Sequence, residues 1–429
     1  MTKEPMTTKG HVVVLSQFYR PEPFLFAPAI AEELEAQGYQ VSVVTGYPNR
    51  PQGKIYSGYR QRLGFSEEIN GISVHRAPLV INHSNKAIER IANFLTFSLG
   101  ALTVSHRIRG ADAVYVYATP ATAGIPAQVW KLLFGIPYVL HVQDLWPESV
   151  TDSGMLGGGR VSRAAAAVMK PWLQRLYGGA ATLIAISPGM RQLLVDRGNP
   201  LETGAVVFNW ADESTVTPKN GETFSDGGVS LLYAGNLGPM QDLETVLAAA
   251  ASLDEEEGFT LVMAGGGVLE DVLRTQAGSL SRTKLVGRFP RAEVGNLYQR
   301  SDFQLVTLKD LPIFRTTVPS KLQASLAAGV PVITTVKGDV AQLIRDHDAG
   351  IVAEPENVES LVAAFRQALS MTAEDRARMG RNARKLYEEH MSKRTGLDAI
   401  VSILDTVVRD RGRTPARGAA PVKSDTENY

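Results

Sequence analysis

The stretch of the chain whose residues could most clearly do chemistry is a loop that runs into a helix at Pro319. Ser320, Lys321 and Gln323 follow in the first turn of the expected helix, which ends at Gly329. Proline is favoured at a first helical position because its missing N–H would have had no partner there. Free N–H groups, the helix dipole and a neighbouring lysine can together hold an anion. An ordinary βα unit with a surface lysine fits the same pattern, so both interpretations stay open.

Glycines follow other expected strands in the same half of the chain. They occur at Gly235-Asn236, at Gly265, Gly266 and Gly267, and at Gly287-Arg288. Glycine lets a ligand approach the backbone closely, although it also simply ends strands and helices. Turns of this kind at the carboxyl ends of parallel strands share one rim, which suggests a nucleotide or its diphosphate. The chain has no G-x-x-x-x-G-K-[ST] pattern, so ATP hydrolysis has no support.

Polar residues also follow a strand expected at 137–142 in the first half, and these are His141, Gln143, Asp144 and Glu148. A carboxylate and an imidazole at this position could orient a hydroxyl nucleophile. Alternatively, Asp144 caps its own turn, because a short carboxylate readily bonds nearby backbone, and His141 is a core residue. Glu22, between two prolines, is a further candidate site residue or a solvated loop charge.

The elements that position these residues alternate between strand and helix in both halves. Residues 211–228 between the halves lack an apolar period and are rich in Gly, Ser, Thr and Asp, which predicts a linker. Alternation of this kind predicts two parallel α/β domains with helices on both faces of each sheet. The predicted units are a disordered start at 1–10, a first domain at 11–210, a second domain at 229–390, a helix at 391–410 able to cross back to the first domain, and a disordered tail at 411–429.

Composition narrows the class of protein. The chain has 429 residues, with 44 basic residues balancing 44 acidic ones, so no strong field argues for a nucleic-acid partner. The absence of cysteine excludes disulfides and thiolate metal sites and fits a reducing compartment. The polar start predicts no signal peptide. No stretch reaches the roughly 18 apolar residues of a spanning helix. The apolar stretch 91–104 comes nearest; we expect it to be a buried helix or one lying on a membrane.

Two familiar motifs are missing. The first βα loop reads QFYRPEPFLF where a dinucleotide site would carry G-x-G-x-x-G. The histidines show no H-E-x-x-H spacing, and no metal site is predicted.

Several motifs in order nevertheless resemble the family 4 glycosyltransferases of the GT-B fold, from about residue 11 to 408. They are most similar to the bacterial polysaccharide subgroup typified by L-fucosamine (N-acetylfucosamine) transferases of O-antigen synthesis. The motifs are SQFY with PE in 16–22, TGYPN at 45–49, GKIY at 53–56, VQDLWPES at 142–149, NWA at 209–211, AGNLG at 234–238, and LKD, PSKLQ and GVP within 308–331.

The resemblance implies two Rossmann-like, doubly wound parallel-sheet domains facing across a cleft. It implies transfer of a sugar, with retention and without a metal or other cofactor, from a nucleotide donor, expected to be UDP-linked, to an acceptor. The implied donor-binding residues are Gly235, Asn236, Gly265, Gly266, Gly267, Arg288, Phe289, Asp310, Ser320, Lys321 and Gln323. Those implied on the acceptor side are Tyr19, Glu22, Asn49 and Tyr56. Asp144 or His141 is implied to lie near the transferred sugar.

This chain departs from its wider family at positions where many members carry charged side chains. Many members carry two glutamates spaced E-x7-E, where Arg315 and Gln323 stand here. Many also place Arg and Lys after the strand at 229–234, where this chain has Asn236 and Gln241. Charge against the leaving diphosphate must then come from elsewhere, and Lys321 with Arg315 is our hypothesis.

Two other functions remain open. One is a UDP-sugar epimerase of GT-B fold, and the other is a non-catalytic nucleotide-sugar-binding component of a polysaccharide synthesis complex. We expect a cytoplasmic protein that acts on a lipid-linked or saccharide acceptor. Because lipid-linked acceptors sit on membranes, the resemblance implies peripheral attachment to the inner face of the plasma membrane. The candidate membrane contacts are 91–104 and 169–177, although core packing is the favoured interpretation of both segments. The oligomeric state is not predicted.

Overall fold

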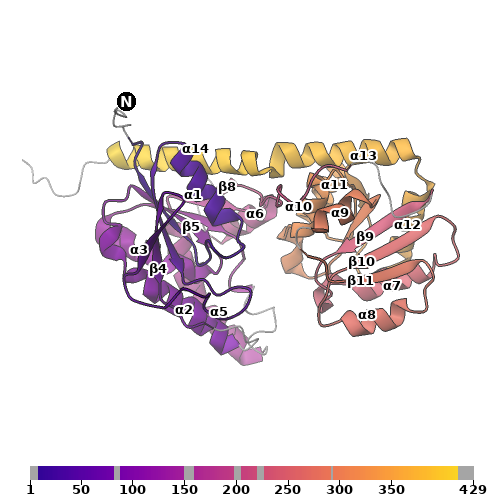
Figure 1. Ribbon diagram of the computed structural model, residues 1–429, viewed down its shortest axis with the longest axis horizontal. Helices are drawn as coiled ribbons and strands as arrows, with labels where there is room; N and C mark the ends of the chain where they lie inside the picture. Colours follow the sequence, from indigo (N-terminus) through magenta and orange to yellow (C-terminus); the bar gives the residue numbers. More distant parts are fainter. Residues whose placement is uncertain are drawn as a thin grey trace, which may run out of the picture.

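The computed structural model describes residues 8–81, 87–148, 159–197, 204–219, 227–290 and 293–413. These residues form two α/β domains placed side by side, each built on one sheet (Figure 1). Parts of the predicted disordered start (1–7), linker (220–226) and disordered tail (414–429) lie outside the described residues. Residues 149–158 also lie outside them, and the first of these, Ser149, is the last residue of the VQDLWPES motif.

The first sheet has the strand order β3-β4-β2-β1-β5-β6-β7-β8. Its strands are β1 (His11–Leu15), β2 (Gln40–Gly46), β3 (Ser66–Ile69), β4 (Ile72–Ala77), β5 (Ala113–Ala118), β6 (Tyr138–Val142), β7 (Thr182–Ala185) and β8 (Gly204–Val206). The helices of this domain are α1 (Phe26–Ala36), α2 (Ala87–Leu102), α3 (Gly124–Phe134), α5 (Gly159–Gly178) and α6 (Pro188–Asp196). The apolar run of β1 forms a central strand because helices cover both of its faces: Val13 packs into one core and Val14 into the other.

One strand of this sheet departs from the expected parallel pattern. β3 pairs antiparallel with β4 through a tight turn at Asn70-Gly71, where both residues have positive φ. An Asn-Gly pair favours a two-residue hairpin because both residues tolerate that conformation. The sequence analysis did not predict this edge strand, and the overlooked signal was this dipeptide.

The second sheet is parallel and has the order β11-β10-β9-β12-β13-β14. Its strands are β9 (Val229–Ala234), β10 (Phe259–Ala264), β11 (Thr283–Gly287), β12 (Phe303–Val306), β13 (Val332–Thr334) and β14 (Gly350–Val352). Its helices are α7 (Leu243–Ala251), α8 (Glu270–Ala277), α9 (Val294–Gln299), α10 (Ser320–Ala327), α11 (Asp339–Asp346), α12 (Val358–Ser370) and α13 (Ala373–Leu386). A 3-10 turn at Pro312–Thr316 precedes α10.

The C-terminal helix connects the two domains. α13 is followed by a π-helical turn at Tyr387–Met391 and by α14 (Lys393–Arg413), and the two helices run along one edge of both domains (Figure 1). Leu397, Ile400 and Leu404 of α14 are buried in a core cluster of the first domain. α14 extends into 411–413, which was expected to be disordered, because the Arg411 side chain donates to the Ala111 carbonyl of the first domain.

Direct contacts also join the domains at the amino end of α6. The Ser187 hydroxyl donates to the Thr316 carbonyl at 2.8 Å, and the Gly189 N–H donates to Asp339 Oδ2 at 2.8 Å. Ser187 also caps α6 by accepting from the Met190 N–H. This junction sets the second domain's loop before α10 against the first domain.

Candidate active site

The glycine turns of the second domain line one cavity of about 480 Å³ at the carboxyl ends of β9, β10 and β11. Its lining is Ala234, Gly235, Asn236, Ala264, Gly265, Gly266, Gly267, Arg288, Phe289, Val294 and Leu297. The backbones approach too closely for side chains: a Cβ on Gly265 would lie 1.8 Å from the Gly235 carbonyl oxygen. Cavities of this size at strand ends are typical small-molecule sites in open α/β sheets.

Lys321, at the start of α10, reaches back to the edge of this cavity. A Cβ on Gly235 would lie 3.2 Å from Lys321 Cε and 3.4 Å from Nζ. The ammonium donates to the Tyr233 hydroxyl at 2.9 Å and lies 4.2 Å from the centre of that ring. Burial lowers the pKa of Lys321 to about 7, because none of the carboxylates in the described residues compensates the cost of desolvating the charge. A bound anion would restore the charged form.

Tyr233 holds this lysine in place, and sequence reasoning overlooked it. Its hydroxyl donates to the Asn236 carbonyl at 2.6 Å, and burial raises its pKa, so the phenol keeps its proton. The lysine is therefore the donor in the Lys321–Tyr233 bond. A tyrosine two residues before a strand-end glycine was the available signal, but its strand pattern predicted only core packing.

Arg315, the second cation that we expected against a diphosphate, is engaged elsewhere. Its guanidinium forms an ion pair with Asp310 at 3.4 Å, and 54% of its side-chain surface is exposed. Asp310 also pairs with Lys337 at 2.9 Å. The bonds to Lys337 and Arg315 lower the pKa of the Asp310 carboxyl, and the bond to Lys337 has the larger effect. Asp310 and Arg315 thus neutralise each other in this structure, and the cations that the described residues bring to the glycine cavity are Lys321 beside Gly235 and Arg288 in its lining.

The remaining donor-side residues divide into two groups. Ser320 is exposed at the amino end of α10, which has no side-chain cap, whereas Gln323 is buried on the same helix. Asn236 and Gln241 bond to each other at 3.3 Å, and Gln241 accepts from the Gly238 N–H at 3.1 Å. The two residues at the family's Arg and Lys positions therefore stabilise the strand-end loop that borders the cavity.

In the first domain, two predicted site residues lie in the interior. His141 on β6 has no exposed surface and shares a 2.5 Å hydrogen bond with the Tyr115 hydroxyl through Nδ1. Desolvation lowers the pKa of His141 to about 3, so the imidazole is neutral. Tyr19 is also buried, among α1 and β1 side chains, and burial raises its pKa to about 12. Neither side chain can touch a substrate without rearrangement, so the core interpretation fits both.

The other predicted residues of this domain lie at the carboxyl edge of its sheet. Asp144 reaches the surface, yet surrounding protein raises the pKa of its carboxyl, an effect that the Arg90 guanidinium opposes. Glu148, in contrast, is paired with Arg197 at 2.8 Å. Asp144 is thus the better placed of the two for a substrate hydroxyl.

Glu22 is a buried carboxylate held by backbone. Its Oε1 accepts from the N–H groups of Asn49 and Arg50, both at 2.8 Å. Burial raises the pKa of Glu22, and those two bonds partly oppose the effect. Tyr56 fixes the same loop by donating to the Arg50 carbonyl. Asn49 and Tyr56 therefore shape the loop around Glu22.

Glu22 also lines a larger cavity, of about 1040 Å³, between the β1–α1 loop and the interdomain segment that begins at Trp210. Tyr59 contributes an aromatic ring to this cavity, and Lys393 of α14 a cation. Ring faces and charged groups together suit a hydroxyl-rich ligand.

Comparison with known proteins defines the family to which this chain belongs. Residues 26–210 match the family model described as Glycosyl transferase 4-like domain, and residues 219–386 match that described as Glycosyl transferases group 1. The chain belongs to this family of glycosyltransferases and has the GT-B fold, which confirms the resemblance and fold class predicted from its motifs.

Individual relatives agree with this assignment. The chain is 27% identical over 361 residues to WcaI of Escherichia coli (strain K12), a glycosyl transferase named for colanic acid biosynthesis, and the match covers 79% of this chain and 86% of WcaI. Among solved structures, Anabaena Alr3699/HepE in complex with UDP is similar at a TM-score of 0.62 and 14% identity, covering 92% of this chain and 99% of that one. Sucrose-phosphate synthase from Thermosynechococcus elongatus is similar at a TM-score of 0.70 and 14% identity, and the match covers 94% of this chain and 100% of that one.

Two features are absent from the described residues. None of the helices there is long and apolar enough to cross a membrane. Within the same parts of the chain, no group of three or more His, Cys, Asp or Glu side chains is arranged to hold a metal ion.

Proposed function

We propose that this glycosyltransferase moves a sugar, with retention at the anomeric carbon, from a UDP-linked donor to an acceptor hydroxyl during cell-surface polysaccharide synthesis. HepE, similar in fold, was solved with UDP, and WcaI is named for colanic acid biosynthesis. The donor would bind in the second domain, and the first domain would bind the acceptor.

The observation that carries this proposal is the Lys321 ammonium beside Gly235 at the glycine cavity. When the bond between sugar and diphosphate breaks, negative charge grows on the departing diphosphate. A preformed cation aimed at that charge stabilises the transition state more than the ground state. The uncapped amino end of α10 adds a favourable dipole at the same place.

The other donor-side residues have supporting roles. The glycines at 265–267 would let the nucleotide lie against the backbone, with the base near Arg288-Phe289. The family resemblance would put the ribose near Gln323, which does not line this cavity and would have to be uncovered on binding. Asp144 would orient a hydroxyl of the transferred sugar from the opposite domain. Since Lys321 meets the diphosphate, we propose that transfer needs no divalent metal; full activity in EDTA is the expected result.

We further propose that the first domain rests on a membrane surface that carries the acceptor. α2 exposes Leu99, at 63% of its surface, and α5 exposes Val168, at 75%. The sequence of α5 has several basic residues and no acidic one. Exposed apolar groups with basic neighbours suit an anionic lipid surface. Co-sedimentation with vesicles of anionic lipid should fall at high salt and in a Leu99→Gln, Val168→Gln double variant.

A donor screen tests the central proposal. The protein is incubated with a panel of UDP-sugars and a lipid-linked acceptor, and product and free UDP are measured. Lys321→Ala should lose about a hundredfold or more of transfer, as removal of an oxyanion donor does, while its thermal unfolding stays cooperative. Wild-type turnover in that variant would remove Lys321 from the mechanism.

The same screen separates the alternatives. An epimerase would release the epimeric sugar or free UDP without an acceptor. A non-catalytic component would be protected against heat by a UDP-sugar yet form no product.

A further inference from the structure

The second domain has another cavity, also of about 480 Å³, at the edge of its sheet opposite the glycine cavity. Asp302 and Pro331 line it, and they directly precede β12 and β13 at the amino ends of these parallel strands. The glycine cavity lies instead at carboxyl ends of strands in the same sheet. The other walls of the second cavity are residues 218–219, the carboxyl end of α10 and one face of α13.

Positive charge predominates in this lining. Its cations are Lys219, Arg376, Arg381 and Arg384, and its carboxylate is Asp302. Asp302 pairs with Lys219 at 3.3 Å and with Arg376 at 3.8 Å. Glu388, from outside the lining, pairs with Arg384 at 2.7 Å. Two positive charges remain when these two carboxylates are set against the four cations, and charges of one sign gathered in a cavity attract a counter-ion.

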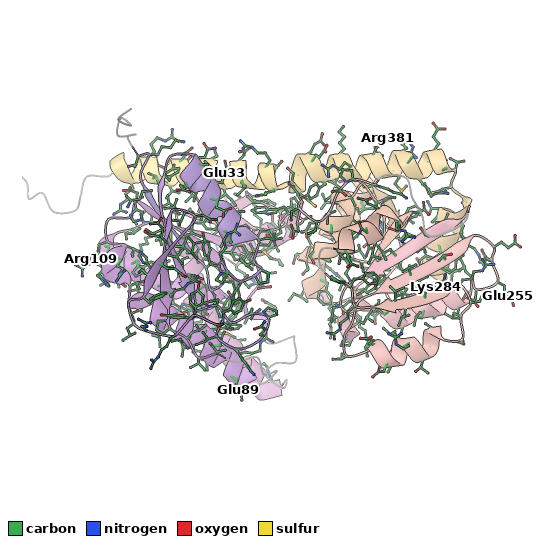
Figure 2. The ribbon with its side chains drawn as sticks, viewed as in Figure 1. Glu33, Glu89, Arg109, Glu255, Lys284 and Arg381 are labelled. Carbon is green, nitrogen blue, oxygen red and sulfur yellow. The ribbon has the colours of Figure 1, made fainter. Side chains whose placement is uncertain are left out.

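Arg381 is the cation of this lining that is available to a ligand. It is exposed on α13, at the outer edge of the second domain (Figure 2). In the part of the chain that the structure describes, it forms no hydrogen bond and no ion pair. The carboxylate nearest to it along the lining face belongs to Glu374, seven residues earlier and roughly 10 Å along the helix axis. Arg381 therefore keeps its charge uncompensated at the mouth of the cavity.

Two further arginines flank a position without a side chain. Arg376 and Arg384 lie four residues before and after Gly380, so all three share one face of α13. A Cβ on Gly380 would lie 2.6 Å from the Gly329 carbonyl oxygen, which keeps this position bare. Arg376 and Arg384 expose only 19% and 33% of their side chains, and charges this buried are screened little by salt.

Both of these guanidinium groups keep donors free for a ligand. Arg376 donates to the Met371 carbonyl and Arg384 to the Ala327 carbonyl. A guanidinium has five N–H donors, so these bonds and the ion pairs do not exhaust them. The planar fork of donors matches the oxygens of a phosphate group in geometry.

We propose that this cavity binds a small phosphorylated molecule, at a site separate from the donor cavity. The phosphate or diphosphate lies against the guanidinium groups of Arg376, Arg381 and Arg384. The organic part lies against the small apolar residues of the lining, such as Ala328 and Pro331.

Helix α10 connects the two cavities. Lys321, in its first turn, reaches the glycine cavity, and Ala327 at its other end lies about 12 Å along the axis. There the Ala327 carbonyl accepts from Arg384, and the Ala328 carbonyl accepts from the Lys219 N–H at 2.8 Å. An anion that draws on Arg384 therefore acts on the end of the helix that carries Lys321, so the ligand is an effector of donor binding.

Calorimetry on the full chain tests the site with inorganic pyrophosphate as the probe. UDP is first added to saturation, so that the donor cavity is filled. Arg381→Gln should weaken pyrophosphate binding about tenfold, the loss of one charged contact. Ala377→Glu should abolish it, because the new carboxylate enters the lining one turn before Arg381, at an exposed position where a helix accepts glutamate.

Two matched variants serve as controls and should bind pyrophosphate like wild type. Ala377→Gln adds nearly the same volume as Ala377→Glu without its charge. Arg378→Gln removes an exposed guanidinium from the same helix, where it pairs with Asp348 outside the cavity. An equal loss in Arg378→Gln and Arg381→Gln would mean that pyrophosphate binds to the charged surface in general, which refutes the site.

The results separate this inference from the proposed function. No pyrophosphate binding in wild type, or undiminished binding in both Arg381→Gln and Ala377→Glu, refutes the site. The site itself does not depend on the proposed function, whereas the effector role does, because it is expressed through donor binding. Failure of UDP to bind would count against the proposed function, and the same titrations without UDP would still test the site.

Two more titrations test the organic part of the ligand and the effector role. Glucose 1-phosphate should bind more tightly than inorganic phosphate, and equal affinities would refute a role for the apolar lining. Saturating pyrophosphate should change the affinity for UDP about fivefold or more, and Ala377→Glu should remove that change. An unchanged UDP affinity, or a change that persists in this variant through competition in the donor cavity, refutes the effector role.

Discussion

The Lys321 ammonium donates a hydrogen bond to the Tyr233 hydroxyl at 2.9 Å and lies 4.2 Å from the centre of the same ring. The tyrosine thus holds the cation beside Gly235 without a carboxylate that would neutralise it. A half-buried lysine with no ion-pair partner among the described residues is costly for the free protein and useful for one that binds a diphosphate.

The first prediction concerns pH. The pKa of Lys321 is lowered to about 7, so above neutral pH the free protein has mostly neutral lysine. A bound diphosphate favours the charged form, so binding takes up a proton, and affinity for a UDP-sugar should fall by up to about tenfold per pH unit above 7. Titration calorimetry in buffers of different ionisation enthalpy measures the proton uptake.

Lys321→Arg is the control for that pH effect, because arginine stays charged throughout this range. Its affinity should vary little between pH 7 and pH 9. The same slope in wild type and variant would assign the titration to another group.

The second prediction concerns Arg288. A Cβ on Gly266 would lie 2.2 Å from Arg288 Nε, and Gly266 does not have positive φ. Gly266→Ala should therefore displace a flexible side chain and leave the backbone unstrained. We expect UDP affinity to fall about tenfold, the loss of one charged contact, with a nearly unchanged melting temperature.

Gly265→Ala provides the contrast. There the added carbon would meet the Gly235 carbonyl oxygen at 1.8 Å, at a φ of +144°. Because backbone cannot move aside as a side chain can, this variant should lose stability as well as binding. An unaltered UDP affinity in Gly266→Ala would exclude Arg288 from nucleotide binding.

The third prediction concerns acid stability. His141 is neutral in the fold with its pKa lowered to about 3, whereas in the unfolded chain it titrates near 6.5. Between these values the unfolded state binds more protons, so folding stability falls as pH drops through this window, by up to about 1.4 kcal/mol per pH unit from this group. Urea unfolding at several pH values measures the slope.

His141→Gln keeps a partner for the Tyr115 hydroxyl and should show a shallower slope. Some dependence should remain, because the pKa of His75 is lowered to about 4 in the same direction. An unchanged slope in the variant would mean that His141 titrates in the native state.

The fourth prediction concerns the junction between domains. Asp339→Ala removes the acceptor of the Gly189 N–H, a bond of 2.8 Å that joins α11 to α6. We expect a loss of about 1 kcal/mol of interdomain contact and a larger radius of gyration by X-ray scattering. Asp346→Ala, at the other end of α11, loses only a bond to Gln342 and should leave the radius unchanged.

The elements that build this fold could be predicted from local patterns. The buried run of β1, the glycines after β9 and β10 and the Pro319-Ser-Lys start of α10 each act through neighbouring residues. Backbone conformation, helix dipoles and the apolar pattern of a strand depend mainly on such short segments, which is why the strand-and-helix order and the glycine-rich strand ends follow from sequence alone.

Pairings between distant residues were decided by tertiary structure. Tyr233 meets Lys321 across 88 positions, and Arg50 reaches Phe18 on another loop. From its residue type alone, Arg315 could be a cation available to a ligand, but the turn before α10 brings it into an ion pair with Asp310. His141 has the chemistry of a catalytic group, but β6 directs it into the core. Residue type fixes what a side chain can do, whereas its partners and its burial, and hence its charge, depend on which elements pack around it.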